Sequence, residues 1–247
     1  LHRVDRRQRQ MCIRDRPPLA PGMKDDVVIH AENPSPGTHD LVASIVAGMA
    51  ADLNIRVRSE GVPDIRQFFQ AHDIVVPAGV VKDPNTDPAP PMEPFVVWQD
   101  ARVKVSAILV PHGLVYPNFA YRFDTAAGSV VFSGDTAVSD NLVKLARGAD
   151  ILVHEAIDPA WVDHIVGAKP WDARQQALAT QLLHAHATPI EVGDVATLAG
   201  VKTLVLSHLV PGDAPAEHWL QASQTFKGPV VLGQDLMRLP LGSPSPR

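Results

Sequence analysis

Short apolar or alternating runs are interspersed with longer stretches of helical period along most of this chain. Runs of the first kind predict strands, and stretches with apolar residues three or four positions apart predict helices. Strands are predicted over residues 27–29, 55–58, 75–81, 95–99, 103–110, 119–123, 129–132, 151–153, 203–206, 230–232 and 236–239. Helices are predicted over residues 38–52, 141–147, 172–183, 188–199 and 219–226.

Turn residues separate these elements and sharpen their ends. Residues 82–94 contain five prolines, which excludes regular structure there. The short turn at residues 126–128 predicts a hairpin between its two flanking strands. Thr38 and Gly200 suit the start of one helix and the end of another. The order of the elements predicts a mixed α/β fold with helices layered on a sheet.

Composition narrows the class of protein. With 247 residues the chain can form one large domain or two small ones, and 45% hydrophobic with 20% charged residues is ordinary for a globular protein. The net charge of −5 gives no general attraction to nucleic acid, and no apolar run is long enough to predict a membrane span. Cys12 is the single cysteine, so an internal disulfide is excluded and a metal would be held by histidines and carboxylates.

The first sixteen residues differ from the rest of the chain. They carry six arginines and two aspartates, with no helical or strand period and no apolar core of a secretory signal. Their pattern resembles translated sequencing-adapter sequence, and a basic arm that binds nucleic acid is the alternative. We therefore expect residues 1–22 to be a leader that is non-native or disordered. Residues 23–247 are predicted to form a single domain whose true N-terminus has been lost.

Polar residues recur where apolar strands end. His112, Asp135 and His208 each follow such a strand, and the pair His154-Glu155 does the same. A single histidine in this position is usually structural, but several at comparable strand ends favour a site, because strand ends gather at an open edge of a layered fold. The sequence therefore predicts that His112, Asp135 and His208 meet around metal ions.

These residues belong to a set of short motifs with a familiar order. The set comprises His112-Gly113, the aromatic and arginine strand around Arg122, Ser133-Gly134-Asp135-Thr136, His154-Glu155-Ala156, His186-Ala187-Thr188, Ser207-His208 and Gly233-Gln234-Asp235-Leu236. In these motifs the chain resembles the metallo-β-lactamase superfamily, in its ribonuclease Z-like and arylsulfatase-like branch, over about residues 27–241. The resemblance implies an αββα sandwich, here incomplete at its N-terminus.

The resemblance also implies roles for the residues. Two divalent ions, usually zinc, with manganese or iron as alternatives, would share Asp135 as a bridging and catalytic carboxylate. His112 would bind the first ion and His208 the second, and the ions would activate a shared water. His186 matches the catalytic histidine that supports the leaving group or the developing oxyanion, with His184 as its competitor. Glu155 would orient a neighbour, whereas Asp140, His164 and His218 are expected to be solvated surface groups.

One motif of the family, H-x-H-x-D-H, is absent from the sequence. The simplest expectation is that the chain begins after this motif. Each ion would then keep two protein ligands, fewer than the three that catalytic zinc sites use. We therefore expect this chain to bind metal weakly and to hydrolyse little.

The short segment between Arg122 and Gly134 bears on the substrate class. Eleven residues separate Arg122 from Gly134, too few for the arm with which tRNA-processing relatives grip their substrate. The sequence favours a small-molecule ester, namely a phosphodiester, sulfate ester or carboxylic ester, and argues against nucleic acid and a membrane as partners. A ribonuclease Z-type endonuclease for tRNA 3′ ends and a non-catalytic binding domain remain the alternatives. A homo-oligomer is allowed, and the cytoplasm is favoured over export by an upstream signal peptide.

Overall fold

The computed structural model describes residues 36–113 and 115–241, and the chain divides into two compact units, Leu1–Ala78 and Gly79–Arg247. The predicted leader and the predicted strand at residues 27–29 lie outside the described residues. A single domain over residues 23–247 stays a prediction. In the described part of the chain, no helix is long and apolar enough to cross a bilayer.

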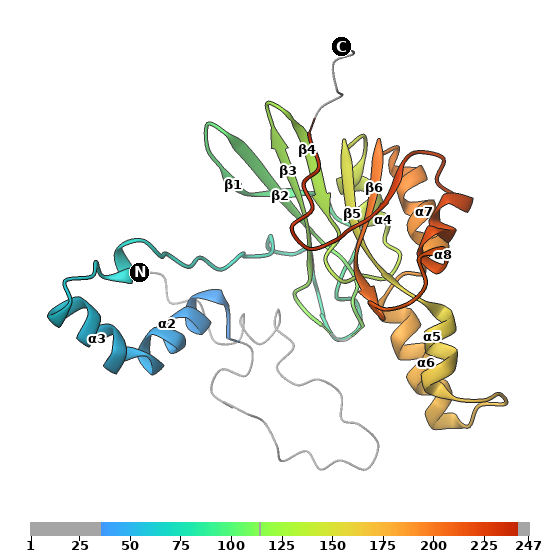
Figure 1. Ribbon diagram of the computed structural model, residues 1–247, viewed down its shortest axis with the longest axis horizontal. Helices are drawn as coiled ribbons and strands as arrows, with labels where there is room; N and C mark the ends of the chain where they lie inside the picture. Colours follow the sequence, from blue (N-terminus) through green and yellow to red (C-terminus); the bar gives the residue numbers. More distant parts are fainter. Residues whose placement is uncertain (1–35, 114, 242–247) are drawn as a thin grey trace. The chain divides into compact units, whose positions relative to one another are not determined.

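The described part of the first unit contains two helices and a 3-10 turn (Figure 1). They are α2 (Thr38–Gly48), α3 (Ala50–Ser59) and η1 (Ile65–Gln67), and none of their residues is buried. Gly37, not Thr38, is the N-cap of α2. The helix predicted to end near Asp52 stops at Gly48, where Met49 leaves helical geometry, and α3 then begins.

Two strand predictions, one in this unit and one that extends past its end, are wrong. Residues 55–58 lie in α3, where Arg56 pairs with Asp52 at 2.7 Å and with Glu60 at 3.7 Å, each one helical turn away. Such pairs support a helix, while the alternation of apolar and basic residues mimics a strand. Residues 75–81 have no regular structure, since no described strand pairs with them.

The described residues of the second unit form one seven-stranded sheet whose spatial order follows the sequence. Strands β1 to β4 pair antiparallel, and β4 to β7 pair parallel. The strands are β1 (Phe95–Gln99), β2 (Val103–Leu109), β3 (Phe119–Thr125), β4 (Gly128–Phe132), β5 (Ile151–Ile157), β6 (Thr203–Val210) and β7 (Val230–Leu232). This confirms the predicted hairpin and mixed α/β class, whereas residues 236–239 form no strand.

Helices connect the parallel strands, because a parallel pair requires a crossover. They are α4 (Asp140–Ala146), α5 (Pro159–Val166), α6 (Ala173–Ala185), α7 (Pro189–Ala199), α8 (Ala216–Trp219) and η2 (Leu220–Gln224). The predicted end of α7 is confirmed, since Gly200 adopts the left-handed conformation at φ 64°. Helix α5 was not predicted, although Asp158 followed by proline is a helix-start signal. The helix predicted over residues 219–226 covers the 3-10 turn η2 and only the last residue of α8.

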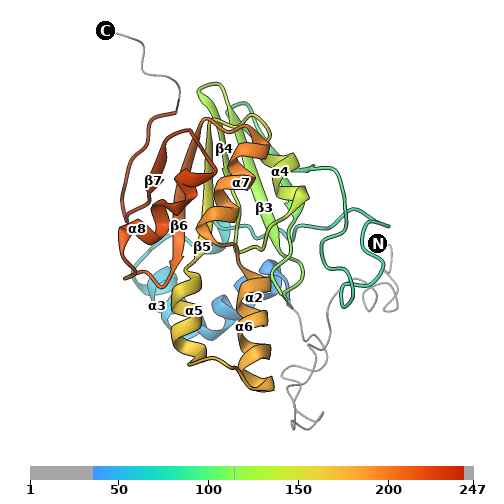
Figure 2. The same cartoon turned by 90° about the vertical axis from the view of Figure 1, so that its right-hand side faces the viewer.

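Helices α4 and α7 lie on one face of the sheet, in front of the strands in Figure 2, whereas α5 and α6 lie below the strands in that view. The core lies between these two layers. Burial of each leucine or isoleucine there contributes about 1.5–3 kcal/mol, which fixes how the strands lie under the helices. Fully buried members include Ile108, Val131, Leu142, Leu152, Val192, Val195, Leu204 and Leu206.

The opposite face of the sheet is apolar and aromatic. Residues paired across strands share a face, and one such row contains Phe95, Ala107, Tyr121, Phe132, Val153 and Val205. Phe132 contacts Phe123 with their ring centroids 5.8 Å apart. Trp98 and Phe132 are 57% and 46% exposed, and no helix of the described second unit covers this side. We call Phe95, Trp98, Tyr121, Phe123 and Phe132 the aromatic face.

A Trp98→Lys substitution tests whether the aromatic face drives self-association. Exposed apolar patches promote association, so we expect the variant to show a smaller aggregated fraction by light scattering. Its free energy of unfolding should change by less than about 0.5 kcal/mol, since the side chain is largely exposed. Leu198→Lys, which replaces another exposed apolar residue on α7, is the matched control and should leave association unchanged. Equal association of Trp98→Lys and the unmodified chain would contradict this prediction.

Candidate functional site

Four strands end at the same edge of the sheet. Strands β2 and β4 both pair antiparallel with β3, so they run in the same direction, and β4, β5 and β6 are mutually parallel. Their carboxyl ends therefore meet, which is the usual place for a site in an open sheet. His112 follows β2, Asp135 follows β4, Glu155 lies in β5 and His208 lies in β6.

Asp135 lies in the tight turn after β4. Gly134 precedes it at φ 62°, and a Cβ at that position would lie 2.8 Å from the carbonyl oxygen of Phe119, so only glycine fits. The Asn118 side chain donates to the carbonyl of Asp135 at 2.7 Å and to that of Val110 at 3.2 Å. These bonds tie the turn to the end of β2, so the backbone that carries the Asp135 carboxylate is held in place.

The ring of His112 is oriented by a hydrogen bond to the backbone. Its Nδ1 donates to the carbonyl oxygen of Ala185 at 2.9 Å, which fixes the tautomer and leaves Nε2 as the nitrogen with a free lone pair. The acceptor is the last residue of α6, directly before His186. This bond therefore joins the end of β2 to the connection between α6 and α7.

The partly buried His186 is paired with the buried carboxylate of Glu155. The Nδ1 of His186 donates to Oε1 of Glu155 at 2.9 Å, and the Glu155 side chain is 1% exposed. The hydrogen bond to Glu155 raises the pKa of His186 above its usual value, against the opposing effect of burial. Oε1 of Glu155 also accepts the backbone N–H of Thr136 at 3.0 Å, so this carboxylate links the Asp135 turn to His186.

His208 projects from an irregularity in β6. The pairing of β5 with β6 shifts between His154 and Ala156, so that Ser207 and His208 lie opposite Glu155 alone. This is a bulge, and His208 adopts the left-handed conformation at φ 46° within it. Its Nδ1 lies 3.6 Å from Oδ1 of Asp135.

The structure thus brings the predicted site residues together. The rings of His112 and His186 are 4.9 Å apart between centroids, and those of His186 and His208 are stacked at 6.3 Å. His184, the alternative to His186, lies exposed in the last turn of α6, and the hydrogen bond to Glu155 is made by His186. The roles of His112, Asp135 and His208 as ligands stay predictions.

The predicted metal site has too few ligands among the described residues. Imidazole nitrogens and a carboxylate are suitable donors for zinc. However, no group of three or more His, Cys, Asp or Glu side chains in the described part of the chain is arranged to hold an ion. The described residues therefore supply part of a ligand set, and they do not by themselves fit a catalytic zinc site.

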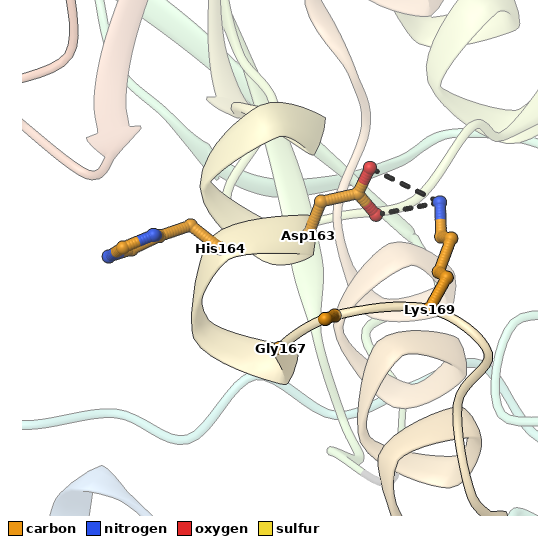
Figure 3. Close-up of a pocket in the computed structure, with 5 residues that line it drawn as sticks. Asp163, His164, Gly167 and Lys169 are labelled. Atoms are coloured by element: carbon orange, nitrogen blue, oxygen red, sulfur yellow. Dashed lines mark hydrogen bonds and ion pairs between the residues drawn. The ribbon is translucent and has the colours of Figure 1, made fainter.

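Other polar groups lie outside this set. His164 and Asp140 are exposed, as expected, and Figure 3 shows His164 turned away from the Asp163–Lys169 ion pair in a pocket on α5 and the loop after it. His218 was expected to be a solvated surface group, but its side chain is partly buried and its Nδ1 lies 2.7 Å from Oδ2 of the buried Asp158. The Asp158-Pro159 pair indicates a helix start, but it gives no signal that Asp158 is buried.

Comparison with known proteins gives a consistent result. The sequence matches the family described as "Beta-lactamase superfamily domain" over residues 44–209. It is 31% identical over 213 residues to a ribonuclease Z of Mycobacterium avium (strain 104), covering 85% of this chain and 66% of that protein. A putative ribonuclease Z of Mycobacterium tuberculosis (strain CDC 1551 / Oshkosh) is 28% identical over 208 residues, with 83% and 80% covered. The chain therefore spans just under two thirds of the first of these relatives.

Solved structures resemble the chain more loosely. The human tRNase Z, short form, is 24% identical and covers 60% of this chain and 46% of its own, with a TM-score of 0.40. With a score this low, the family assignment depends on the sequence match.

The buried His154 should make stability depend on pH. Its Nδ1 donates to the carbonyl of Glu155 at 2.7 Å, its Nε2 has no partner among the described residues, and burial lowers its pKa to about 4 from 6.5. As pH falls, the unfolded chain binds this proton first, so stability present above pH 6.5 is lost between about 6.5 and 4. Between pH 7 and 5 the free energy of unfolding should fall by about 2 kcal/mol more in the native chain than in His154→Asn. Urea unfolding at several pH values measures this, and parallel curves for the two proteins would contradict it.

Proposed function

This chain belongs to the family described as the β-lactamase superfamily domain, and on that premise we propose that it is a metal-dependent hydrolase acting on a phosphodiester. The observation that carries the proposal is the meeting of His112, Asp135, His186 and His208 at one edge of the sheet. A cluster of imidazoles around a carboxylate suits a cation and an activated water, and the family match gives it a hydrolytic context.

The residues divide into two groups by their hydrogen bonds. Nε2 of His112, which is free of the bond to Ala185, the carboxylate of Asp135 and the ring of His208, 3.6 Å from that carboxylate, are proposed to supply part of the ligand set for zinc, with manganese or iron as alternatives. His186 is proposed as the catalytic acid. Glu155 holds its Nδ1, and the raised pKa keeps a larger fraction of the ring protonated near neutral pH, so Nε2 can give a proton to a leaving oxygen.

Two observations bear on the substrate. The β3–β4 connection is a tight hairpin, with Thr125 opposite Gly128, which supports a small phosphodiester because no long arm extends from it. The relatives named ribonuclease Z support RNA as a second candidate, and they weaken the sequence argument against nucleic acid. Both candidates contain a phosphodiester, so the bond to be cleaved is the common element of the proposal.

Metal content tests the predicted weakness of the ligand set. After purification and dialysis against metal-free buffer, we expect less than about one zinc per chain by elemental analysis, since no three donors among the described residues are arranged to hold an ion. In excess zinc, binding measured by calorimetry should weaken in Asp135→Asn and stay unchanged in His164→Ala. Retention of about two zinc ions per chain through dialysis would contradict this prediction.

Hydrolysis tests the reaction class. With added zinc or manganese, the chain should slowly cleave bis(p-nitrophenyl) phosphate in preference to p-nitrophenyl sulfate and p-nitrophenyl acetate. His186→Ala should lower the rate by about 10²–10⁴-fold through loss of the proton donor, and His164→Ala should not change it. A tRNA precursor with a 3′ trailer, assayed in parallel, distinguishes the RNA candidate. A rate unaffected by both Asp135→Asn and His186→Ala would exclude this site as its source.

A further inference from the structure

A second histidine–carboxylate pair lies outside the residues assigned so far. Asp158 directly follows β5, its residue is 5% exposed, and its Oδ2 lies 2.7 Å from Nδ1 of His218 on α8. Its Oδ1 accepts the backbone N–H of Ala160 at 2.9 Å, which caps α5. Both carboxylate oxygens are therefore bonded, as a buried carboxylate requires.

The backbone of Asp158 is bonded to the segment that carries His208. Its N–H donates to the carbonyl of Val210 at 2.8 Å, at the end of β6. Val210 lies two residues beyond His208, so this bond closes the pairing of β5 with β6 directly after the bulge. A hydrogen bond in this position limits how far the bulge can open.

His218 holds the other end of the same segment. The chain leaves β6 at Val210 and returns through a loop to α8, where Trp219 is 1% exposed and its Nε1 donates to the carbonyl of Ala214 at 3.3 Å. The bond from His218 to Asp158 thus fastens the far end of the loop to the residue that already holds its near end.

His208 needs such restraint. A non-glycine residue at φ 46° is in a sparsely populated conformation, which persists only where the surroundings enforce it. The His208 side chain is 53% exposed and its contact with Asp135 is long at 3.6 Å, so contacts of the side chain alone are weak restraints. The restraint therefore has to come from the backbone on either side.

We infer that Asp158 and His218 are positioning residues that hold the Ser207–His208 bulge, and through it the His208 ring, toward Asp135. The inference concerns the geometry of the site in the proposed function, and it requires neither residue to touch substrate or metal. The two residues act as a clasp: the Asp158 backbone holds the end of β6, and its carboxylate holds α8.

Residue-level amide exchange by NMR on the full chain tests the clasp without any metal. In His218→Ala, the amides of Asp158, Leu209 and Val210 should exchange at least about tenfold faster, while those of β3 keep their rates. His218→Asn places an amide N–H where Nδ1 lies and should restore protection at these positions. Asp158→Asn keeps the cap and an amide beside His218, so it shows how much of the protection depends on charge.

Two controls separate a clasp from general stability. His164→Ala removes an exposed histidine of α5 and should leave all rates unchanged. Unchanged protection in His218→Ala, or an equal loss of protection across the whole sheet, would overturn the inference, as would failure of His218→Asn to restore it.

A zinc titration links the clasp to the proposed function. His218→Ala should weaken zinc binding about fivefold to tenfold, the lower end of the usual coupling between sites, and should have no further effect in a His208→Ala background. Additive losses in the double variant would overturn action through His208. Absence of zinc binding by every variant would count against the proposed function alone, because the exchange experiment decides the clasp independently.

Discussion

The buried carboxylate of Glu155 is the interaction on which the site depends. One of its oxygens accepts two N–H groups, from the backbone of Thr136 at 3.0 Å and from the ring of His186 at 2.9 Å. A carboxylate with 1% exposure is costly unless such donors compensate for lost water, and the donors would themselves be left unsatisfied without it. Glu155 in β5 therefore fixes the turn after β4 and the α6–α7 connection relative to each other. These two hydrogen bonds determine the positions of Asp135 and His186.

Strand direction brings the remaining residues to that carboxylate. Because β3 separates two strands that run the same way, β2 delivers His112 to the edge at which β4, β5 and β6 also end. The bond from His112 to the carbonyl of Ala185 then connects β2 to the same α6–α7 connection. Residues far apart in sequence thus meet through a few bonds at one sheet edge.

The sequence was sufficient where the signal is local. Strands at residues 95–99 and 230–232 are confirmed at their predicted bounds, and turn chemistry located Gly200 and the β3–β4 hairpin. The strands predicted at residues 55–58 and 236–239 are wrong because alternation of apolar and polar residues does not by itself form a strand. A strand needs a neighbour to satisfy its backbone, and the described structure offers none to either segment.

The same distinction applies to the site. His112, Asp135 and His208 could be chosen from their place after apolar runs, and the structure puts them together. Three other features could not be predicted from the sequence, since each depends on contacts between distant segments. They are the bulge at His208, the hydrogen bonds of Asn118 and the Asp158–His218 pair. His218 was expected to be solvated for the same reason, because its partner Asp158 lies 60 residues away in the sequence and is buried.

The incomplete ligand set and the aromatic face have a common physical explanation. The described second unit supplies one sheet and one helical layer, while the predicted sandwich has two sheets. A sheet that is apolar on the side away from its helices is stable in water only when another layer covers that side. Side chains at the edge of a single sheet would reach a bound cation from one side only, and no three donors among the described residues are arranged to hold an ion. Donor atoms that complete the shell would therefore have to come from elements facing the same edge, so covering the aromatic face and completing the metal site are expected to occur together.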